Sequence, residues 1–388
     1  MRVLVITQIF PNAAEPLSAP FNRQQLAGLG RLCEVEVLGV LPWFPGVRLA
    51  ARWSSAGRRG EVPRHETVSG LPVTHPRALY VPRVARSLSA ALYAASVAPE
   101  VLRRRGQVDI VLGTWAYPDG CAAVVLAGLV RVPAVVKLHG SDLNVNARMR
   151  GPRAQLRALL PRAARVVAVS NALAGEAKAL GVPADRIRVV PNGVDETRFF
   201  PADRAAARAE LGLDAGRRLL LYVGNLKESK GVLDLAEAFG RVAAARGDAD
   251  LVVVGDGEAR EQMPGVDRMR LVGARPHEEV ARWMAAADLL VLPSWNEGMP
   301  NAVIEALACG RRVVATAVGG VPDLLASPLL GDLVPPRRPA ELAAALIRAL
   351  DRPYDPSDVA AGALSGSWAD SAARLFAVLE EALDRKSG

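Results

Sequence analysis

Cysteine, histidine and aromatic residues are scarce in this chain of 388 residues. Its three cysteines (Cys33, Cys121 and Cys309) and four histidines show no spacing typical of a metal site, such as Cys-x-x-Cys or His-Glu-x-x-His. Because the cysteines lie in apolar segments, we expect them to be reduced core residues of a cytosolic protein. Aromatic residues make up only 5% of the chain and are not interleaved with a basic motif, which argues against a nucleic-acid partner.

Long apolar runs are absent as well. No stretch approaches the ~20 apolar residues that a membrane-spanning helix needs. The first ten residues, MRVLVITQIF, lack a small-residue cleavage site and therefore predict a first strand rather than an export signal. With 51% hydrophobic and 23% charged residues, the composition is that of a soluble globular protein, and the length favours two domains. We expect a cytoplasmic protein.

The net charge of +8 is distributed unevenly. Residues 1–190 hold 25 Lys and Arg against 11 Asp and Glu, a balance of +14, whereas residues 191–388 hold 23 against 29, a balance of −6. This asymmetry favours an anionic partner for the first half. Two Arg-rich segments, 81–106 and 148–165, show helical spacing. Either their arginines contact an anionic membrane surface, with the protein peripheral on its inner face, or they are merely solvated.

The most informative stretch is residues 293–310, PSWNEGMPNAVIEALACG. It follows an apolar run typical of a buried strand, continues as a tight loop, and shows helical spacing from Asn301 to a stop at Gly310. A helix start of this kind leaves free backbone N–H groups that suit an anion. Two carboxylates, Glu297 and Glu305, flank the site. They are suited to accept hydrogen bonds from the hydroxyl groups of a sugar and a ribose.

Short apolar runs followed by polar or glycine-containing loops recur along the chain. This alternation predicts an open α/β sheet, in which ligands bind at the carboxyl ends of the strands. The predicted strands are residues 3–6, 35–40, 109–113, 133–138, 166–169, 187–190, 289–292 and 313–317. Residues 42–80 predict a mobile segment with short strands.

The frame EG-x-P-x-x-x-x-E-A-x-A-C-G, which contains Glu297 and Glu305, resembles the paired-glutamate motif of retaining glycosyltransferases of family 4, which have the GT-B fold. The sequence CGRRVVATAVGGVPDLL extends this resemblance. In the first half, AYPDG and VPAVVKLHGSDLN are similar to the first domain of the same family. SAPFNRQQ resembles a subgroup associated with surface-polysaccharide synthesis, of the teichuronic-acid type.

This resemblance implies an α/β protein of GT-B fold, with two Rossmann-like domains facing across a cleft. Residues 1–194 would bind the acceptor, residues 195–363 the nucleotide sugar, and residues 364–388 would form a C-terminal helix that packs back on the first domain. The implied activity is that of a retaining hexosyltransferase in cell-surface polysaccharide or glycolipid synthesis. The donor would be a UDP- or GDP-sugar, and the acceptor a sugar, a lipid-linked molecule or a small molecule. We expect no cofactor, no Asp-x-Asp metal motif in the chain, and therefore no need for a divalent metal ion.

The resemblance also implies site residues. His139, Lys230 and Glu297 are the expected catalytic residues. Lys230 would stabilise the leaving diphosphate, Glu297 would hold sugar hydroxyls and Glu305 the ribose. The expected donor-binding residues are Gly224, Asn225, Lys227, Lys230, Gly273, Ala274, Arg275, Glu297, Gly298, Met299, Pro300, Asn301 and Glu305. The expected acceptor-side residues are Asn22, Arg23, Tyr117, Asp119, His139, Ser141 and Asp142.

The chain departs from the family pattern at two places. It lacks the Gly-Gly pair that many members carry after the first strand, and Asn225 stands where relatives often have an arginine. We expect Lys227 to supply the missing charge. Two other functions stay open: a GT-B sugar-nucleotide epimerase, and a non-enzymatic protein that binds anionic lipid. A Rossmann dehydrogenase is disfavoured because no G-x-G-x-x-G follows the first strand.

Overall fold

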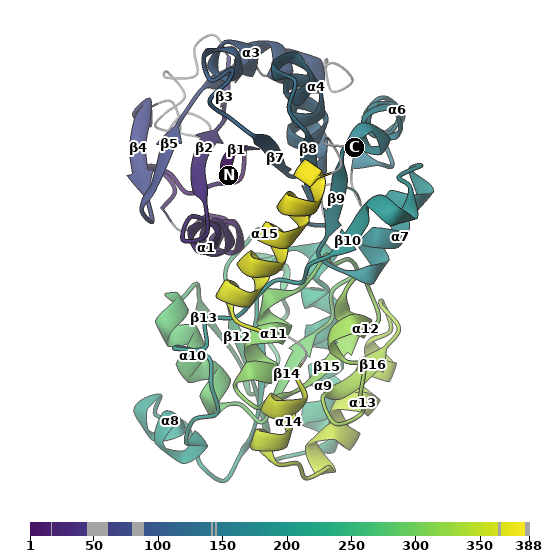
Figure 1. The fold of residues 1–388 in the computed structure, drawn as a ribbon. Helices are drawn as coiled ribbons and strands as arrows, with labels where there is room; N and C mark the ends of the chain where they lie inside the picture. The colour runs from purple at the N-terminus through teal and green to yellow at the C-terminus, as the bar shows by residue number, and fades with distance from the viewer. Residues whose placement is uncertain are drawn as a thin grey trace. The chain divides into compact units, whose positions relative to one another are not determined.

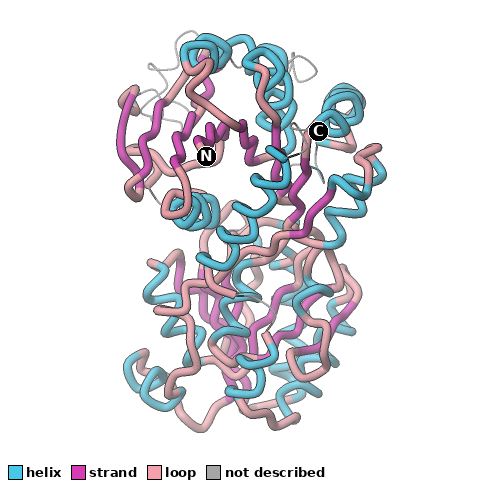
Figure 2. The backbone as a smooth tube through the Cα atoms, viewed as in Figure 1, coloured by secondary structure: helices cyan, strands magenta, loops and turns pink. Residues whose placement is uncertain are grey.

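The structure is a computed structural model that describes residues 1–16, 18–44, 61–79, 89–140, 143, 146–363 and 366–384. The chain forms two compact units. Unit 1 consists of Met1–Gly193 and Trp368–Gly388, and unit 2 of Val194–Ser367. Each unit is built on a largely parallel β-sheet flanked by helices (Figures 1 and 2). The predicted α/β class is therefore confirmed.

Unit 1 contains an eight-stranded sheet in the order β10-β9-β8-β7-β1-β2-β5-β4 and a two-stranded sheet of β3 and β6. Only β4 runs antiparallel to its neighbour. The strands are β1 (Arg2–Thr7), β2 (Glu34–Gly39), β3 (Leu41–Trp43), β4 (His65–Val68), β5 (Leu71–Thr74), β6 (Arg77–Leu79), β7 (Ile110–Thr114), β8 (Ala134–Leu138), β9 (Arg165–Ala168) and β10 (Ile187–Val189). The principal helices are α1 (Pro20–Leu29), α3 (Ser89–Arg103), α4 (Cys121–Val130), α6 (Arg150–Leu159), α7 (Asn171–Ala179) and α15 (Trp368–Asp384).

Alternation along β1 divides the core of unit 1 between the two faces of its sheet. Val3 and Val5 join a cluster with residues of α1 and α15. Leu4 and Ile6 join a second cluster with residues of α3 and α4. A sheet covered on both faces needs continuous apolar strands, which is why these strands were recognisable in the sequence.

The C-terminal helix α15 packs on unit 1, as predicted. It contacts α1, and Figure 1 shows it in yellow beside that helix. The Gln25 side-chain amide of α1 donates to the Ser371 hydroxyl of α15 at 2.8 Å, and that hydroxyl donates to the Pro191 carbonyl oxygen at 2.6 Å. These buried hydrogen bonds connect segments that lie far apart in the chain.

Unit 2 contains a six-stranded parallel sheet in the order β13-β12-β11-β14-β15-β16. Its strands are β11 (Arg218–Val223), β12 (Ala249–Val254), β13 (Met269–Gly273), β14 (Leu289–Leu292), β15 (Arg312–Thr316) and β16 (Gly331–Val334). Its helices are α8 (Arg204–Glu210), α9 (Val232–Ala245), α10 (His277–Ala286), α11 (Asn301–Ala308), α12 (Val321–Leu324), α13 (Pro339–Asp351) and α14 (Pro356–Gly362). One large apolar cluster joins β11 and β12 to α9 and α13.

Two described arginines of segment 81–106, Arg103 and Arg104, form ion pairs at the end of α3. Residues 81–88 lie outside the described part of the chain, and Arg103 and Arg105 are exposed. Arg104 pairs with Glu100 at 2.9 Å and with Glu36, while Arg103 and Arg64 also pair with Glu100. Burial by itself would raise the pKa of Glu100, but hydrogen bonds from these arginines outweigh that effect and lower the pKa to about 2. The helix end is therefore an ion-pair cluster.

The described segments include no helix with both the length and the apolarity needed to cross a membrane. Short strands do occur within residues 42–80, at β4, β5 and β6, as the sequence predicted. Residues 45–60 and residue 80 lie outside the described part.

Candidate functional site

The loops that follow β11 and β14 lie against each other at the carboxyl-end edge of the unit 2 sheet. These strands are parallel neighbours. The Trp295 N–H donates to the Ser229 carbonyl oxygen at 2.9 Å and thus connects the two loops. Gly231 has a φ of +66°, and a Cβ there would lie 2.0 Å from the Pro293 carbonyl oxygen. Only glycine permits this approach, and it brings Lys230 next to the loop that carries Glu297.

Lys230 and Glu297 form an ion pair. The Lys230 Nζ donates to Glu297 Oε1 at 2.7 Å, and the Ser294 Oγ donates to the same oxygen at 2.7 Å. Glu297 is only 9% exposed, whereas the Lys230 side chain is 30% exposed. A cation and a hydroxyl therefore compensate the burial of this carboxylate. Two of the predicted catalytic residues, 67 positions apart, meet here.

Glu305 has a different partner. The Nε2 of His277 lies 3.0 Å from Glu305 Oε1, in a hydrogen bond that joins the first residue of α10 to the second turn of α11. This hydrogen bond raises the pKa of His277 against the opposing effect of burial. His277 was not among the predicted site residues. The signal that could have found it is its position two residues after Arg275, directly behind a loop expected to bind the donor.

The remaining expected donor residues lie on loops at the same edge of the sheet. Asn225 and Lys227 are exposed after β11, and Lys227 has no ion pair within the described residues. The loop of Gly273, Ala274 and Arg275 follows β13, and Arg275 lies 3.6 Å from Glu279. The Gly273 carbonyl oxygen accepts from the Gly255 N–H at 2.9 Å, which connects this loop to the one after β12.

The loop Gly298–Pro300 leads into α11. The Gly298 carbonyl oxygen accepts from the Gly320 N–H at 2.9 Å, and Met299 and Pro300 are buried. Helix α11 begins at Asn301, and Pro300 is its N-cap. No side-chain hydrogen bond caps this helix start, and the Val303 N–H donates to the Pro300 carbonyl oxygen at 3.1 Å.

One Asp-x-Asp sequence, at Asp248 and Asp250, corrects the expectation that the chain lacks such a motif. The structure shows what holds these carboxylates. Asp248 pairs with Arg246 at 3.1 Å and Asp250 with Arg217 at 2.6 Å. They lie at the amino end of β12, the opposite edge of the sheet from Glu297. Among the described residues, no three His, Cys, Asp or Glu side chains gather as a metal site would require.

The expected acceptor-side residues of unit 1 have varied surroundings. Asn22 is fully buried and donates through Nδ2 to the Ile9 carbonyl oxygen and the Thr114 hydroxyl, both at 2.9 Å. Asp119, also fully buried, accepts from the Gln8 N–H at 2.8 Å. Arg23 is half-buried on α1. Ser141 and Asp142 lie outside the described residues.

His139 follows β8 and lies among aromatic rings. Its ring centroid is 4.9 Å from that of Phe21 and 5.9 Å from that of Trp115. Burial, together with the nearby Lys137, lowers the pKa of His139 well below its usual value. His139 is therefore a neutral imidazole at neutral pH, able to make hydrogen bonds but not to supply a positive charge.

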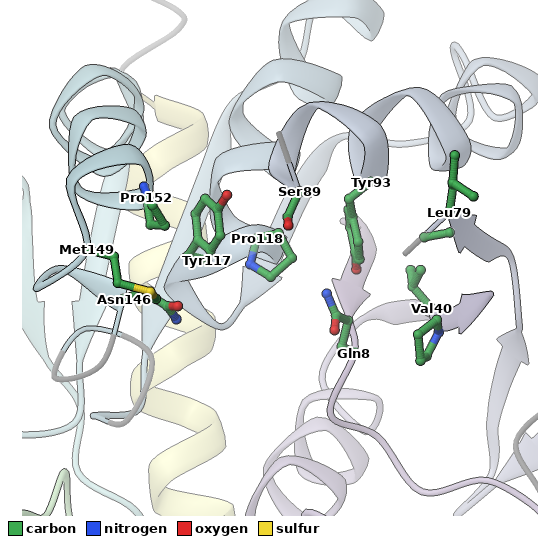
Figure 3. A pocket seen from close by; sticks show the side chains of 12 residues that line it. Gln8, Val40, Leu79, Ser89, Tyr93, Tyr117, Pro118, Asn146, Met149 and Pro152 are labelled. Carbon is green, nitrogen blue, oxygen red and sulfur yellow. The ribbon is translucent and has the colours of Figure 1, made fainter. Parts of the chain in front are cut away.

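Unit 1 also contains a pocket of about 290 Å³. Figure 3 shows hydroxyl groups of Ser89, Tyr93 and Tyr117 among apolar side chains such as Met149 and Leu79. Of the expected acceptor-side residues, Tyr117 lines this pocket. Its mixture of aromatic, hydroxyl and apolar groups is typical of sites that bind small organic molecules.

Both halves of the chain match models of protein families. Residues 27–198 match the model described as Glycosyltransferase Family 4, and residues 217–352 match that described as Glycosyl transferases group 1. The chain is 33% identical over 332 residues to the putative teichuronic acid biosynthesis glycosyltransferase TuaC of Bacillus subtilis. This alignment covers 84% of this chain and 83% of that protein. It is 32% identical over 319 residues to D-inositol 3-phosphate glycosyltransferase 1 of Catenulispora acidiphila, covering 74% and 76%.

Solved structures show the same architecture at low sequence identity. HepE of Anabaena, solved in complex with UDP, superposes with a TM-score of 0.69 at 20% identity and covers 100% of this chain and 99% of its own. The lipopolysaccharide outer core galactosyltransferase WaaB in its apo form has a TM-score of 0.65 at 17% identity and covers 100% of both chains. These similarities confirm the predicted GT-B fold.

Proposed function

The chain belongs to glycosyltransferase family 4, and from this premise we propose that it transfers a sugar, with retention of the anomeric configuration, from a nucleotide sugar to an acceptor. The donor would bind at the carboxyl-end edge of the unit 2 sheet. The observation that supports this most directly is the Lys230–Glu297 ion pair at 2.7 Å, because it joins a cation and a carboxylate beside two helix starts without side-chain caps.

Lys230 is suited to the leaving diphosphate. Its ammonium group has three N–H donors, one of which is used by Glu297, and its side chain is 30% exposed. The amino ends of α9 and α11 add partial positive charge from their helix dipoles at the same edge. Charge that develops on the diphosphate as the bond to the anomeric carbon breaks would be stabilised by these fixed groups.

Glu297 and Glu305 are suited to hydroxyl groups. Lys230 and Ser294 hold the Glu297 side chain in place through hydrogen bonds to Oε1, so that it can accept hydrogen bonds from the transferred sugar. His277 orients Glu305 in the same way for the ribose. In the proposed reaction, the acceptor oxygen bonds to the anomeric carbon on the face that the diphosphate leaves, and the acceptor's proton passes to the diphosphate. No covalent enzyme intermediate is needed.

The acceptor would bind in unit 1, in the pocket that Tyr117 lines. Similarity to TuaC over 84% of the chain supports an acceptor in cell-surface polysaccharide synthesis. Similarity to D-inositol 3-phosphate glycosyltransferases supports a small-molecule acceptor as the alternative. HepE was solved with UDP-glucose, which makes UDP-sugars the first donors to test.

The test is a calorimetric screen of UDP-, GDP-, ADP- and dTDP-sugars, followed by product analysis with the donor that binds. Glu297→Gln keeps the size of the side chain but removes its charge, and we expect kcat/KM to fall about a hundredfold, which corresponds to about 3 kcal/mol of transition-state stabilisation. Lys178→Ala, an exposed lysine on α7, is the control. Turnover of Glu297→Gln within a factor of two of the parent would refute the site.

Product analysis without acceptor separates the alternative reaction. A transferase leaves the nucleotide sugar unchanged or hydrolyses it slowly when no acceptor is present. Release of an epimerised nucleotide sugar under these conditions would identify a sugar-nucleotide epimerase and overturn the proposal.

A further inference from the structure

Unit 2 contains a polar pocket of about 400 Å³. It lies at the edge of the unit 2 sheet opposite to Glu297. It is lined by residues at the amino ends of three strands: Arg218 begins β11, Leu289 begins β14, and Arg311 directly precedes β15. Because these strands are four to six residues long, the two edges are separated by roughly 15 Å. This pocket is therefore not part of the proposed donor site.

Arg311 is the unusual residue of the pocket. It is only 1% exposed. One guanidinium nitrogen donates to the Ala202 carbonyl oxygen at 3.3 Å, but its Nε has no hydrogen-bond partner. Within the described residues no carboxylate lies within 4 Å of it. A buried cation without a counter-charge is strongly unfavourable, and a bound anion would compensate it.

The carboxylates of the pocket are already occupied. Asp288 pairs with Arg204 through Oδ1 and with Arg208 through Oδ2, and its Oδ2 also accepts from the Leu219 N–H at 2.7 Å. Asp351 pairs with Arg246. Neither aspartate of this pocket forms an ion pair with Arg311.

Two further cations complete the arrangement. Arg218 and Arg352 line the pocket, are exposed, and have no ion pair within the described residues. Four arginines thus line the pocket against two aspartates, and both aspartates are also bound by arginines from outside the lining. The pocket therefore has an excess of positive charge that the described residues of unit 2 do not neutralise.

We propose that this pocket binds a small phosphate-bearing anion. Guanidinium groups recognise phosphate oxygens through paired hydrogen bonds, and Arg311 is held ready by its burial. The volume of about 400 Å³ accommodates a diphosphate with a sugar or nucleoside attached. The ligand would bind without contacting Lys230 or Glu297, so this is a second anion site on the same unit.

Titration of the full chain with inorganic pyrophosphate tests the proposal. Because pyrophosphate also resembles the leaving group of the donor, the titration is done in a Lys230→Ala background. We expect binding to persist in that background and to weaken at least tenfold in Arg218→Ala/Arg352→Ala, which changes exposed side chains and should leave the fold intact. Arg241→Ala/Arg348→Ala, which removes two exposed helix arginines outside the pocket, is the matched control and should bind like the parent.

A second variant addresses the buried cation. Arg311→Met is made in the Lys230→Ala background and removes a charge without a counter-ion. We expect its Tm without ligand to be no lower than that of Lys230→Ala alone, and pyrophosphate no longer to raise it. Inorganic phosphate, sulfate and UDP are further titrants. Weaker binding of phosphate and sulfate than of pyrophosphate indicates that the diphosphate is recognised, and tighter binding of UDP indicates that the nucleoside contributes. Loss of all pyrophosphate binding with Lys230→Ala, unchanged binding in Arg218→Ala/Arg352→Ala, or equal binding of sulfate would each overturn the proposal.

Discussion

At the scale of single residues, Lys137 has an unusual environment because it is a fully buried amine on β8. Its ammonium donates to the Gln25 side-chain oxygen, and no carboxylate pairs with it within the described residues. Burial lowers the pKa of Lys137 from 10.5 to about 7. Between these two values the unfolded chain carries a proton that the folded protein has released.

This pKa predicts the effect of Lys137→Met on stability. Between pH 7 and 10.5 the unfolded state binds more protons than the folded state, so the free energy of unfolding rises with pH in that window. The destabilisation caused by burying Lys137 is therefore largest below pH 7 and decreases towards pH 10.5. We expect Lys137→Met to raise the free energy of unfolding by roughly 4 kcal/mol at pH 7, and the gain to vanish near pH 10.5. Urea unfolding of both proteins between pH 6 and 10 measures this difference. A gain that does not change with pH would contradict the argument.

A second prediction concerns His277. It contacts Glu305 rather than the reacting groups, so it acts as a positioning residue. We expect His277→Ala to raise KM for the donor about tenfold, since a misplaced Glu305 loses about one hydrogen bond to a charged group, with a smaller change in kcat. His277→Gln can still donate to Glu305 and should restore most of the affinity. If both variants lose kcat equally and keep the parental KM, the positioning role is wrong.

At the scale of elements, the loop that carries Glu297 depends on Gly319. Gly319 has a φ of +54°, and a Cβ there would lie 1.9 Å from the Glu297 carbonyl oxygen. We expect Gly319→Ala to displace this loop and to lower kcat/KM by at least tenfold, because small misplacements of catalytic groups are costly. Gly265→Ala, at a position open to solvent, is the control. Steady-state kinetics and thermal unfolding of both variants separate a displaced loop from a general loss of structure.

Helix α6 carries the basic face that the sequence suggested for the Arg-rich segment 148–165. It buries Pro152 and Leu156 and exposes Arg150, Arg153 and Arg157, three arginines without ion pairs within the described residues. Each arginine near an anionic bilayer contributes at most about 1 kcal/mol, so three acting together would give weak, reversible binding.

Co-sedimentation with vesicles tests whether α6 meets an anionic membrane. We expect binding to phosphatidylglycerol vesicles, no binding to neutral vesicles, and weaker binding as salt rises. Replacing all three α6 arginines by Gln should abolish it, whereas replacing Arg241, Arg282 and Arg348, exposed arginines of unit 2, should not. A parent protein that ignores anionic vesicles even at low salt shows that these arginines are only solvated.

At the scale of the whole molecule, we expect activity to be independent of divalent metal ions. Lys230 and the helix starts at the carboxyl-end edge can stabilise the leaving diphosphate without one, and the Asp-x-Asp pair is held by Arg217 and Arg246 at the other edge. Turnover in the presence of EDTA should therefore equal that without it. Loss of activity that Mg²⁺ or Mn²⁺ restores would disprove this expectation.

The sequence by itself determined the local elements. Apolar runs such as residues 289–292, the loop residues after them and the stop at Gly310 depend only on neighbours within a few positions, so the strand, loop and helix around Glu297 could be predicted. The C-terminal helix that the family resemblance implied within residues 364–388 forms over Trp368–Asp384. The family motif then indicated the GT-B fold, because its residues lie close together in the chain.

Only the tertiary structure decided which of these elements meet. The unit 2 sheet places β11 beside β14 although β12 and β13 come between them in the chain, and this order brings Lys230 to Glu297 across 67 residues. The His277–Glu305 pair and the burial of Arg311 likewise depend on how helices and strands pack. A charge pattern along the chain cannot show which arginine finds a carboxylate, because that depends on the distances between segments that the folded chain brings together.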